Sequence, residues 1–260
     1  MVFVMNGFAD LHDSNHTNYR DLLVNLAGSA RTAGRKAVLS GRWLADTVIE
    51  LAPRVPVRDV ETLSKHHSGR TGAPLARSMI RSSGRVSAAI GAAAGGLIAL
   101  QEVSIAGLLA VPFELAAETA LVVLLEIKLV AELHQVAGRP LPGGVREQVA
   151  AAVRSWLSGR GVSAVGLVAT SGGAEMLLGR TTRHKLTMAL RRRFTRNLTT
   201  LGPMLTGSAV AGYLNRKATL DVGRRLAEDL GIGRSRALAR SQRALPVGAA
   251  VDVDESGNGP

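Results

Sequence analysis

Two carboxylates four residues apart are the side chains best placed to do chemistry in this 260-residue chain. Glu114 and Glu118 share one face of a predicted helix, where the two like charges repel each other unless a cation pairs with them. We interpret them as partners of an arginine from a neighbouring helix, such as Arg77, Arg81 or one of the arginines at 191–193. An ion or proton site inside a helical bundle and plain exposure to solvent are the alternatives.

A basic segment supplies the second candidate chemistry. Between positions 183 and 196, leucines and a phenylalanine recur every fourth residue opposite a cationic face. Such a helix can bind an anionic membrane surface, where each basic residue contributes about 1 kcal/mol. It can also neutralise nucleic-acid phosphates, or it can simply face solvent. The chain shows no helix-turn-helix pattern, zinc finger or aromatic stacking platform, so anionic lipid is the predicted partner and nucleic acid is not. The predicted membrane-surface residues are Arg183, Lys185, Arg191, Arg192, Arg193 and Arg196.

No segment has the spacing of a known catalytic or cofactor site. Gly28 and Gly34 are one residue too far apart for a phosphate loop, and no Ser or Thr follows Lys36. The serine within 161–166 misses the spacing of a nucleophile elbow. The adjacent histidines at 66–67 lie on a polar segment and are expected to be solvated. We therefore predict no enzyme, no cofactor and no metal site.

The carboxylates lie in the longest apolar stretch of the chain, residues 87–136. We predict that this stretch forms a Gly/Ala-rich helical hairpin at the centre of an all-α, multi-helix bundle. The first leg ends with the uncharged residues 86–101, and the second is predicted to begin at Pro112, a favourable first residue for a helix. Gly91 and Gly95 form a GxxxG step in the first leg, which lets another backbone approach closely.

Charge within the second leg bears on where the hairpin lies. Glu114, Glu118, Lys128 and Glu132 fall within a sector of about 80° of this helix, and each charge at the centre of a bilayer costs roughly 2.5–3.5 kcal/mol. The uncharged residues of the first leg make about 24 Å of helix, which is short of a hydrocarbon core of about 30 Å. Three placements remain open: a hairpin that enters or crosses the membrane with the stripe turned inward, an interfacial hairpin, and the core of a soluble bundle.

Breaks in the pattern divide the chain into four parts. Residues 1–16 are a predicted flexible leader, 17–52 an N-terminal helix, 53–231 the main helical domain, and 232–260 a basic and then acidic disordered tail. The 32 Lys and Arg outnumber the 20 Asp and Glu, and the resulting net charge of +12 favours polyanionic partners. Cysteine is absent, which fits a reducing compartment.

The C-terminal helices carry a family resemblance. The segment GPMLTGSAVAGYLNRKATLDVGRRLAEDLG is similar to the closing signature of the EcsC family, and the segments PFELAAETALVVLLEIKLVAELHQVAGRPL and APRVPVRDVETLSKHHSG resemble other parts of that family. The resemblance covers about residues 50–231. It implies an all-helical bacterial protein without known enzymatic chemistry, and it brings no catalytic residues to carry over. The residues that match the closing signature are Pro203, Gly207, Asn215, Thr219 and Gly223.

Together these features predict a non-enzymatic, membrane-associated bacterial protein on the cytoplasmic side of the cell membrane. It would be anchored or docked through the hairpin at 86–125 and through its basic amphipathic helices. Arg77, Arg81 and Arg85 before the first leg agree with a cytoplasmic flank under the positive-inside rule. A soluble, cytoplasmic interaction module with the hairpin as its core is the first alternative, and a nucleic-acid-binding protein is the second. A protein partner of unknown identity is compatible with these readings.

Overall fold

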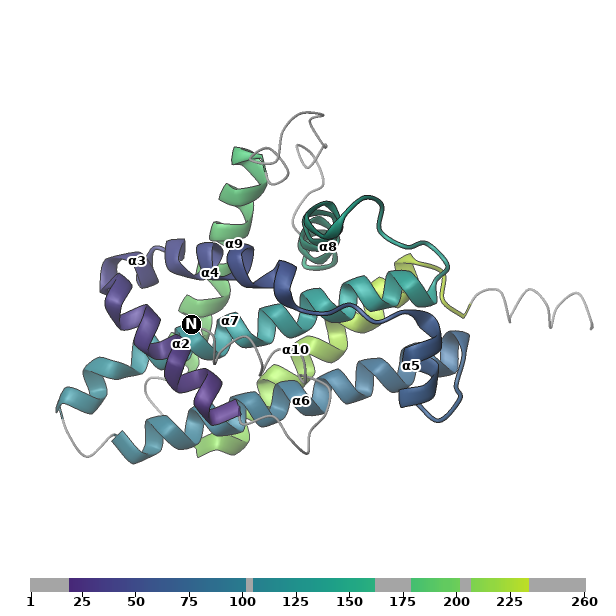
Figure 1. Cartoon of the computed structure of the whole chain (residues 1–260). Coiled ribbons are helices and arrows are strands. Elements are labelled where there is room, and N and C mark those ends of the chain that lie inside the picture. Colours follow the sequence, from purple (N-terminus) through teal and green to yellow (C-terminus); the bar gives the residue numbers. More distant parts are fainter. Residues whose placement is uncertain (1–18, 102–104, 162–178, 202–206, 234–260) are drawn as a thin grey trace, which may run out of the picture.

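The computed structural model describes residues 19–101, 105–161, 179–201 and 207–233, and every regular element in these ranges is a helix (Figure 1). The predicted all-α, multi-helix bundle is therefore confirmed. The predicted leader, and the tail from residue 234 onward, lie outside the described residues. The helices are α2 (Tyr19–Ala33), α3 (Arg35–Leu39), α4 (Arg42–Leu51), the 3-10 helix η1 (Ala52–Arg54), α5 (Val60–His66), α6 (Gly72–Gln101), α7 (Ile105–Val136), α8 (Val145–Gly159), α9 (Arg180–Leu201) and α10 (Gly207–Asp229).

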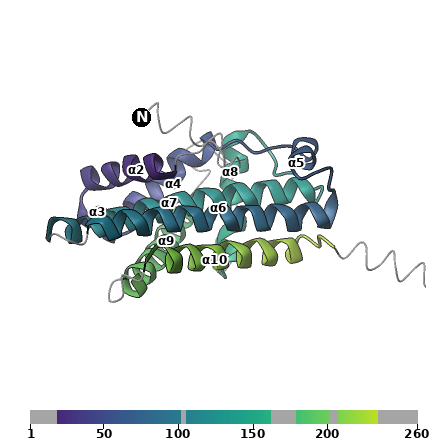
Figure 2. The ribbon, with the colours of Figure 1, turned by 90° about the horizontal axis from the view of Figure 1, so that it is seen from below.

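Helices α6 and α7 form the hairpin and lie side by side along the molecule (Figures 1 and 2). Helix α7 is central, and α2, α4, α8, α9 and α10 all pack on it. The five consecutive residues 121–125 of α7 are 0% exposed. A helix that is apolar on every side is expected to be buried on every side, which is the position that α7 takes.

In the described parts of the chain, no helix combines the length and the apolar composition needed to cross a membrane. A hairpin that crosses the membrane, which is one part of the first predicted placement, therefore finds no support here.

Two helices extend beyond their predicted limits. Helix α7 begins at Ile105, so Pro112 lies inside it and is not its first residue. Proline has no amide hydrogen, so one helical hydrogen bond is lost there, yet the apolar residues on both sides continue the helix. Helix α10 is continuous, whereas its sequence predicts two helices over 206–215 and 218–230. No proline or glycine lies between Tyr213 and Val222 to divide it.

The N-terminal segment folds as three helices, and the prediction of one helix over 17–52 is wrong. Gly34 and Gly41 have φ angles of 86° and 75° and separate α2 from α3 and α3 from α4. Glycine adopts positive φ without the steric cost that other residues meet. At Gly41 a Cβ would also lie 2.9 Å from the Cβ of Arg191, so this turn lets α9 come close. Apolar residues from all three helices join the same core as α6 and α7.

Helices α6 and α10 pack closely because each presents glycine to the other. A Cβ at Gly91 would lie 2.8 Å from the carbonyl oxygen of Ala211, and a Cβ at Gly212 would lie 2.8 Å from that of Ala88. Gly91, predicted to admit another helix, therefore faces α10. Gly95 lies one turn further along α6 and is half-buried. Small residues on both helices set the distance between the two backbones.

Replacing Gly91 by alanine should destabilise the fold, because the new methyl group would meet the Asn215 amide nitrogen at 2.7 Å and the Ala211 carbonyl oxygen at 2.8 Å. Overpacking of this kind lowers the free energy of unfolding by about 1–3 kcal/mol. Gly28→Ala is the matched control, since Gly28 is also inside a helix and nothing lies within 4 Å of a Cβ built there. Urea denaturation measures both variants, and equal effects would contradict the close approach of α6 and α10.

Candidate functional site

Five charged side chains of α7 are buried, each at most 4% exposed. An unpaired charge in such surroundings costs several kcal/mol, so the bundle can form only if other segments supply partners. The predicted inward stripe accounts for four of the five. The fifth, Glu126, lies in a different direction around the helix. The five residues are Glu114, Glu118, Glu126, Lys128 and Glu132.

Glu126 is at the centre of a polar cluster that joins four helices. Its Oε2 accepts a hydrogen bond from Trp156 Nε1 at 2.9 Å and one from Arg193 Nη1 at 2.9 Å. The same oxygen accepts from Arg160 Nη2. Trp156 is on α8, Arg160 directly follows α8, and Arg193 is on α9, so a single carboxylate ties both helices to α7.

Helix α10 reaches the same core through two residues of the family-like signature. The Thr219 hydroxyl donates to Glu126 Oε1 at 3.1 Å and lies 2.9 Å from the hydroxyl of Ser87 on α6. One helical turn earlier, Asn215 Nδ2 donates to Glu118 Oε1. Each of these side chains therefore donates to one oxygen of a buried α7 carboxylate.

The remaining signature positions differ in what the structure describes. A Cβ at Gly223 would lie 2.9 Å from the side chain of Ile80, so this glycine lets α10 settle against α6. Gly207 is the first residue of α10. Pro203 lies outside the described residues. Asn215, Thr219 and Gly223 are thus packing residues of α10, and Asn215 also borders a cavity beside this helix.

Burial and charge shift two glutamates in opposite directions. Burial alone would raise the pKa of Glu126, but the charges of Arg160 and Arg193 outweigh it and lower the pKa to about 2. Burial raises the pKa of Glu118 to about 7, because the hydrogen bond from Asn215 and the charge of Arg193 oppose it only in part. Glu126 is therefore an anion at any physiological pH, and Glu118 takes up a proton near neutrality.

The arginine predicted to answer Glu114 is present, but it comes from another helix than those named. Arg31 of α2 binds Glu114 Oε1 at 3.1 Å, in place of Arg77, Arg81 or the arginines of α9. At the other end of α7, Lys128 and Glu132 form a buried ion pair of 2.5 Å. Lys128 also donates to the carbonyl oxygen of Pro56, which holds the segment before α5 against the core.

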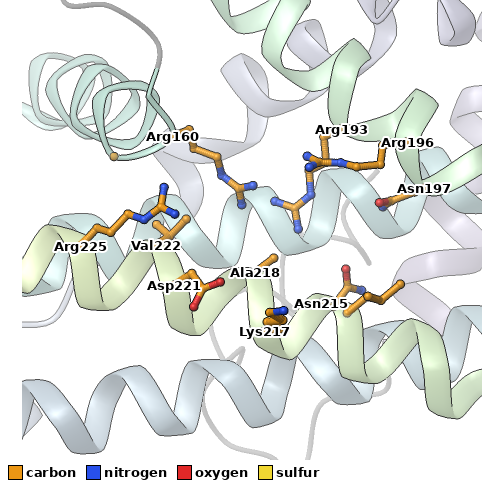
Figure 3. A pocket seen from close by; sticks show the side chains of 12 residues that line it. Arg160, Arg193, Arg196, Asn197, Asn215, Lys217, Ala218, Asp221, Val222 and Arg225 are labelled. Atoms are coloured by element: carbon orange, nitrogen blue, oxygen red, sulfur yellow. The ribbon is translucent and has the colours of Figure 1, made fainter. Parts of the chain in front are cut away.

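A cationic cavity of about 360 Å³ opens beside the Glu126 cluster, between α8, α9 and α10 (Figure 3). Figure 3 shows Arg160 and the arginines of α9 on one side of it and the side chains of α10 on the other. Against these cations the described lining has one acidic side chain, Asp221. Five positive charges and one negative charge give the lining a net charge of +4. The basic lining residues are Arg160, Arg193, Arg196, Lys217 and Arg225.

The five cations are held in two ways. Arg160 and Arg193 are fixed by Glu126, and their side chains are 17% and 6% exposed. Arg160 also stacks over the ring of Trp156 at 5.0 Å, and its buried Nε has no hydrogen-bond partner within the described ranges. The other three cations are exposed to solvent. The cavity thus has an inner pair held by Glu126 and an outer set exposed to solvent, an arrangement suited to an anion.

The predicted membrane-surface residues do not share one face. Arg193 is wrong as a surface residue, because it is buried against Glu126. Arg183 pairs with Asp46 of α4, and Arg191 lies beside α3. Periodicity separates apolar from basic positions, but it cannot tell which arginine has a carboxylate facing it. The exposed members are Arg183, Arg191, Arg192 and Arg196, and Lys185 is half-buried.

Sequence reasoning missed Glu126, Trp156 and Arg160 as members of the site. One signal was available: a carboxylate in the middle of an apolar helix, outside the charged stripe, demands an internal cationic partner. Which cation answers it follows only from the packing of α8 on α7. Within the described residues, no group of three or more His, Asp or Glu side chains is placed to hold a metal ion.

Glu126→Gln should destabilise the protein strongly, because it leaves Arg160 and Arg193 without their counter-charge in a largely buried place. Removing one partner of a buried ion pair costs about 3–5 kcal/mol. Glu50→Gln is the control, since its pair with Arg54 is exposed and such pairs contribute about 0–1 kcal/mol. Urea denaturation compares the two variants, and a loss below about 1 kcal/mol for Glu126→Gln would refute the central role of this carboxylate.

Glu118 should make the fold less stable as the pH rises through neutrality. Its pKa is raised from 4.5 to about 7, so between these values the folded protein binds more protons than the unfolded chain does. The free energy of unfolding then falls with rising pH, by on the order of 3 kcal/mol in total. Glu118→Gln should remove this part of the slope, as measured by urea denaturation from about pH 5 to 8. His67 and His134 are present in both the unaltered protein and Glu118→Gln, so their contributions to the slope cancel. An unchanged slope in Glu118→Gln would contradict the raised pKa of Glu118.

Comparisons with known proteins add no relative to this picture. No family model matches the chain, and neither a curated protein nor a solved structure is similar enough to count as a match. Function must therefore be argued from the Glu126 cluster and the cationic cavity themselves.

Proposed function

We propose that this protein is a non-enzymatic, peripheral membrane protein that binds phosphate groups of anionic lipids on the cytoplasmic side of a bacterial cell membrane. The observation that carries the proposal is the cationic cavity, in which five basic side chains from three parts of the bundle converge on one space. A cavity of this charge attracts anions, and phosphate oxygens are the acceptors that guanidinium groups bind best.

The exposed face of α10 beside the cavity supports a bilayer as the source of the phosphate. Val210, Tyr213 and Leu214 are exposed near the start of α10, Tyr213 by 62%. Leu214 also lines the cavity, and Lys217 follows on the same helix. Apolar side chains with a tyrosine, next to basic side chains, match the boundary between acyl chains and headgroups.

On this proposal the membrane lies at α10 and not at the hairpin 86–125. To insert into a bilayer, α7 would have to give up the partners of Glu126, and each broken buried pair costs about 3–5 kcal/mol. Docking at α10 breaks none of these pairs. Each basic residue brought near an anionic leaflet contributes about 1 kcal/mol, so the exposed cations of the cavity suffice for reversible attachment.

Membership of the EcsC family is part of the proposal. It rests on the resemblance over about residues 50–231, and it is supported by the positions of Asn215, Thr219 and Gly223. These three face the core, where they hold α10 against α6 and α7. A signature of packing residues with no catalytic group agrees with a binding role.

Lys217→Glu together with Arg225→Glu should weaken attachment to anionic vesicles at least about tenfold, because two of the exposed cations become anions. Sedimentation with an equal mixture of phosphatidylcholine and phosphatidylglycerol measures the binding, and added salt should reduce it. The control, Arg20→Glu with Lys65→Glu, makes the same change of charge on α2 and α5, on the other side of the bundle from α10 (Figure 2). Equal losses in both double variants, or equal binding to pure phosphatidylcholine, would contradict the proposal.

A further inference from the structure

We infer that the cationic cavity is selective for a phosphomonoester, the terminal phosphate of a phosphatidic-acid-type lipid or of a small soluble phosphate, over a phosphodiester headgroup. For the lipid source, this inference rests on the proposed function. For a small soluble phosphate, the inference is independent of the proposed function. Three properties of the cavity lead to it: the fixed geometry of its inner arginines, its net charge and its enclosure between three helices.

The inner arginines are oriented before any ligand arrives. Arg160 and Arg193 each donate one described hydrogen bond to Glu126 Oε2, and a guanidinium has five N–H donors in a planar fork. Further donors of both groups therefore remain for a ligand. Two rigid forks recognise a group that offers several oxygens at one end, because each fork can take two of them. A terminal phosphate has three such oxygens, whereas a diester has two.

The charge of the site also favours the monoester. With Glu126 counted beside Asp221, the five cations exceed the nearby anions by three. A phosphomonoester carries a charge of about −1.5 to −2 at neutral pH, and a diester carries about −1. The more highly charged group neutralises more of the excess. It also gains more from the largely buried pair, where the effective dielectric constant is lower than in water.

The size and enclosure of the cavity favour the free end of a phosphate. The cavity volume of about 360 Å³ is on the order of ten waters at roughly 30 Å³ each, enough to admit a whole phosphate group. Helices α8, α9 and α10 enclose it on three sides, with the inner arginines beside Glu126. A terminal phosphate can reach these arginines with its three free oxygens. A diester is substituted on both sides, so a second substituent would have to share the same space.

The test compares phosphatidic acid with phosphatidylglycerol, each mixed with phosphatidylcholine and matched in vesicle surface charge by zeta potential. We expect the full-length protein to bind the phosphatidic acid vesicles about tenfold more tightly. Arg160→Lys keeps the charge beside Glu126 and removes the planar fork, so its affinity for phosphatidic acid should fall more than its affinity for phosphatidylglycerol, and the preference should be lost. Arg146→Lys, an exposed position at the start of the same helix, is the matched control and should behave as the unaltered protein.

Each outcome decides between the two proposals. Equal affinity of the unaltered protein for both matched vesicles would overturn the monoester inference and leave the proposed function standing. Failure to bind either anionic vesicle would overturn the proposed function, and calorimetric titration with glycerol 3-phosphate then tests the soluble source. Heat of binding that Arg160→Lys abolishes would support the site, and no heat would overturn it. Arg193→Lys, at the other inner arginine, keeps the charge and removes the fork, and it replaces Arg160→Lys if that variant does not fold.

Discussion

The bundle depends on the pairing of charges that lie along an apolar helix. Helix α7 must be buried because most of its surface is apolar, and its five charged side chains then need partners where water cannot supply them. Such pairs add little net stability compared with apolar contacts, but an arrangement that leaves one unpaired is heavily penalised. A core of alanine, valine and leucine would tolerate several registers of helix on helix. The pairs formed by Glu114, Glu118 and Glu126 leave α2, α8, α9 and α10 one favourable register each.

The cationic cavity is a by-product of the same pairing. Glu126 draws Arg160 and Arg193 from two parts of the chain to one point, and their charges exceed its own. The excess faces the space beside α10, where further basic residues add to it. Because the inner arginines are already ordered by Glu126, a ligand loses little side-chain entropy on binding there. On the proposed function, stability of the core and recognition of an anion are thus linked through a single carboxylate.

Helical periodicity made most of the fold predictable, and the failures share a physical reason. The hairpin, the basic helix and the inward direction of Glu114 and Glu118 follow from spacing alone. The breaks at Gly34 and Gly41 and the continuous helix through Pro112 do not, since glycine occurs inside helices and proline can be accommodated in one. The site was harder still. Helical spacing puts Arg193 on the apolar face of α9 and Arg192 on the opposite face, so it already separates the buried arginine from the exposed one. That Glu126 is the partner of Arg193 follows only from the packing of α9 on α7.

The polar link between α7 and α10 has a consequence for biosynthesis. Thr219 follows Glu126 by 93 residues, so α7 leaves the ribosome long before α10 exists. At a translation rate of about 5–20 residues per second, the delay is about 5–20 s. Throughout that interval the nascent chain carries an apolar hairpin with carboxylates that lack their α10 donors, which is the kind of surface that chaperones bind. A ribosome stalled before α10 would therefore hold a species prone to aggregation, and completion of the last described helix is the step that closes the fold.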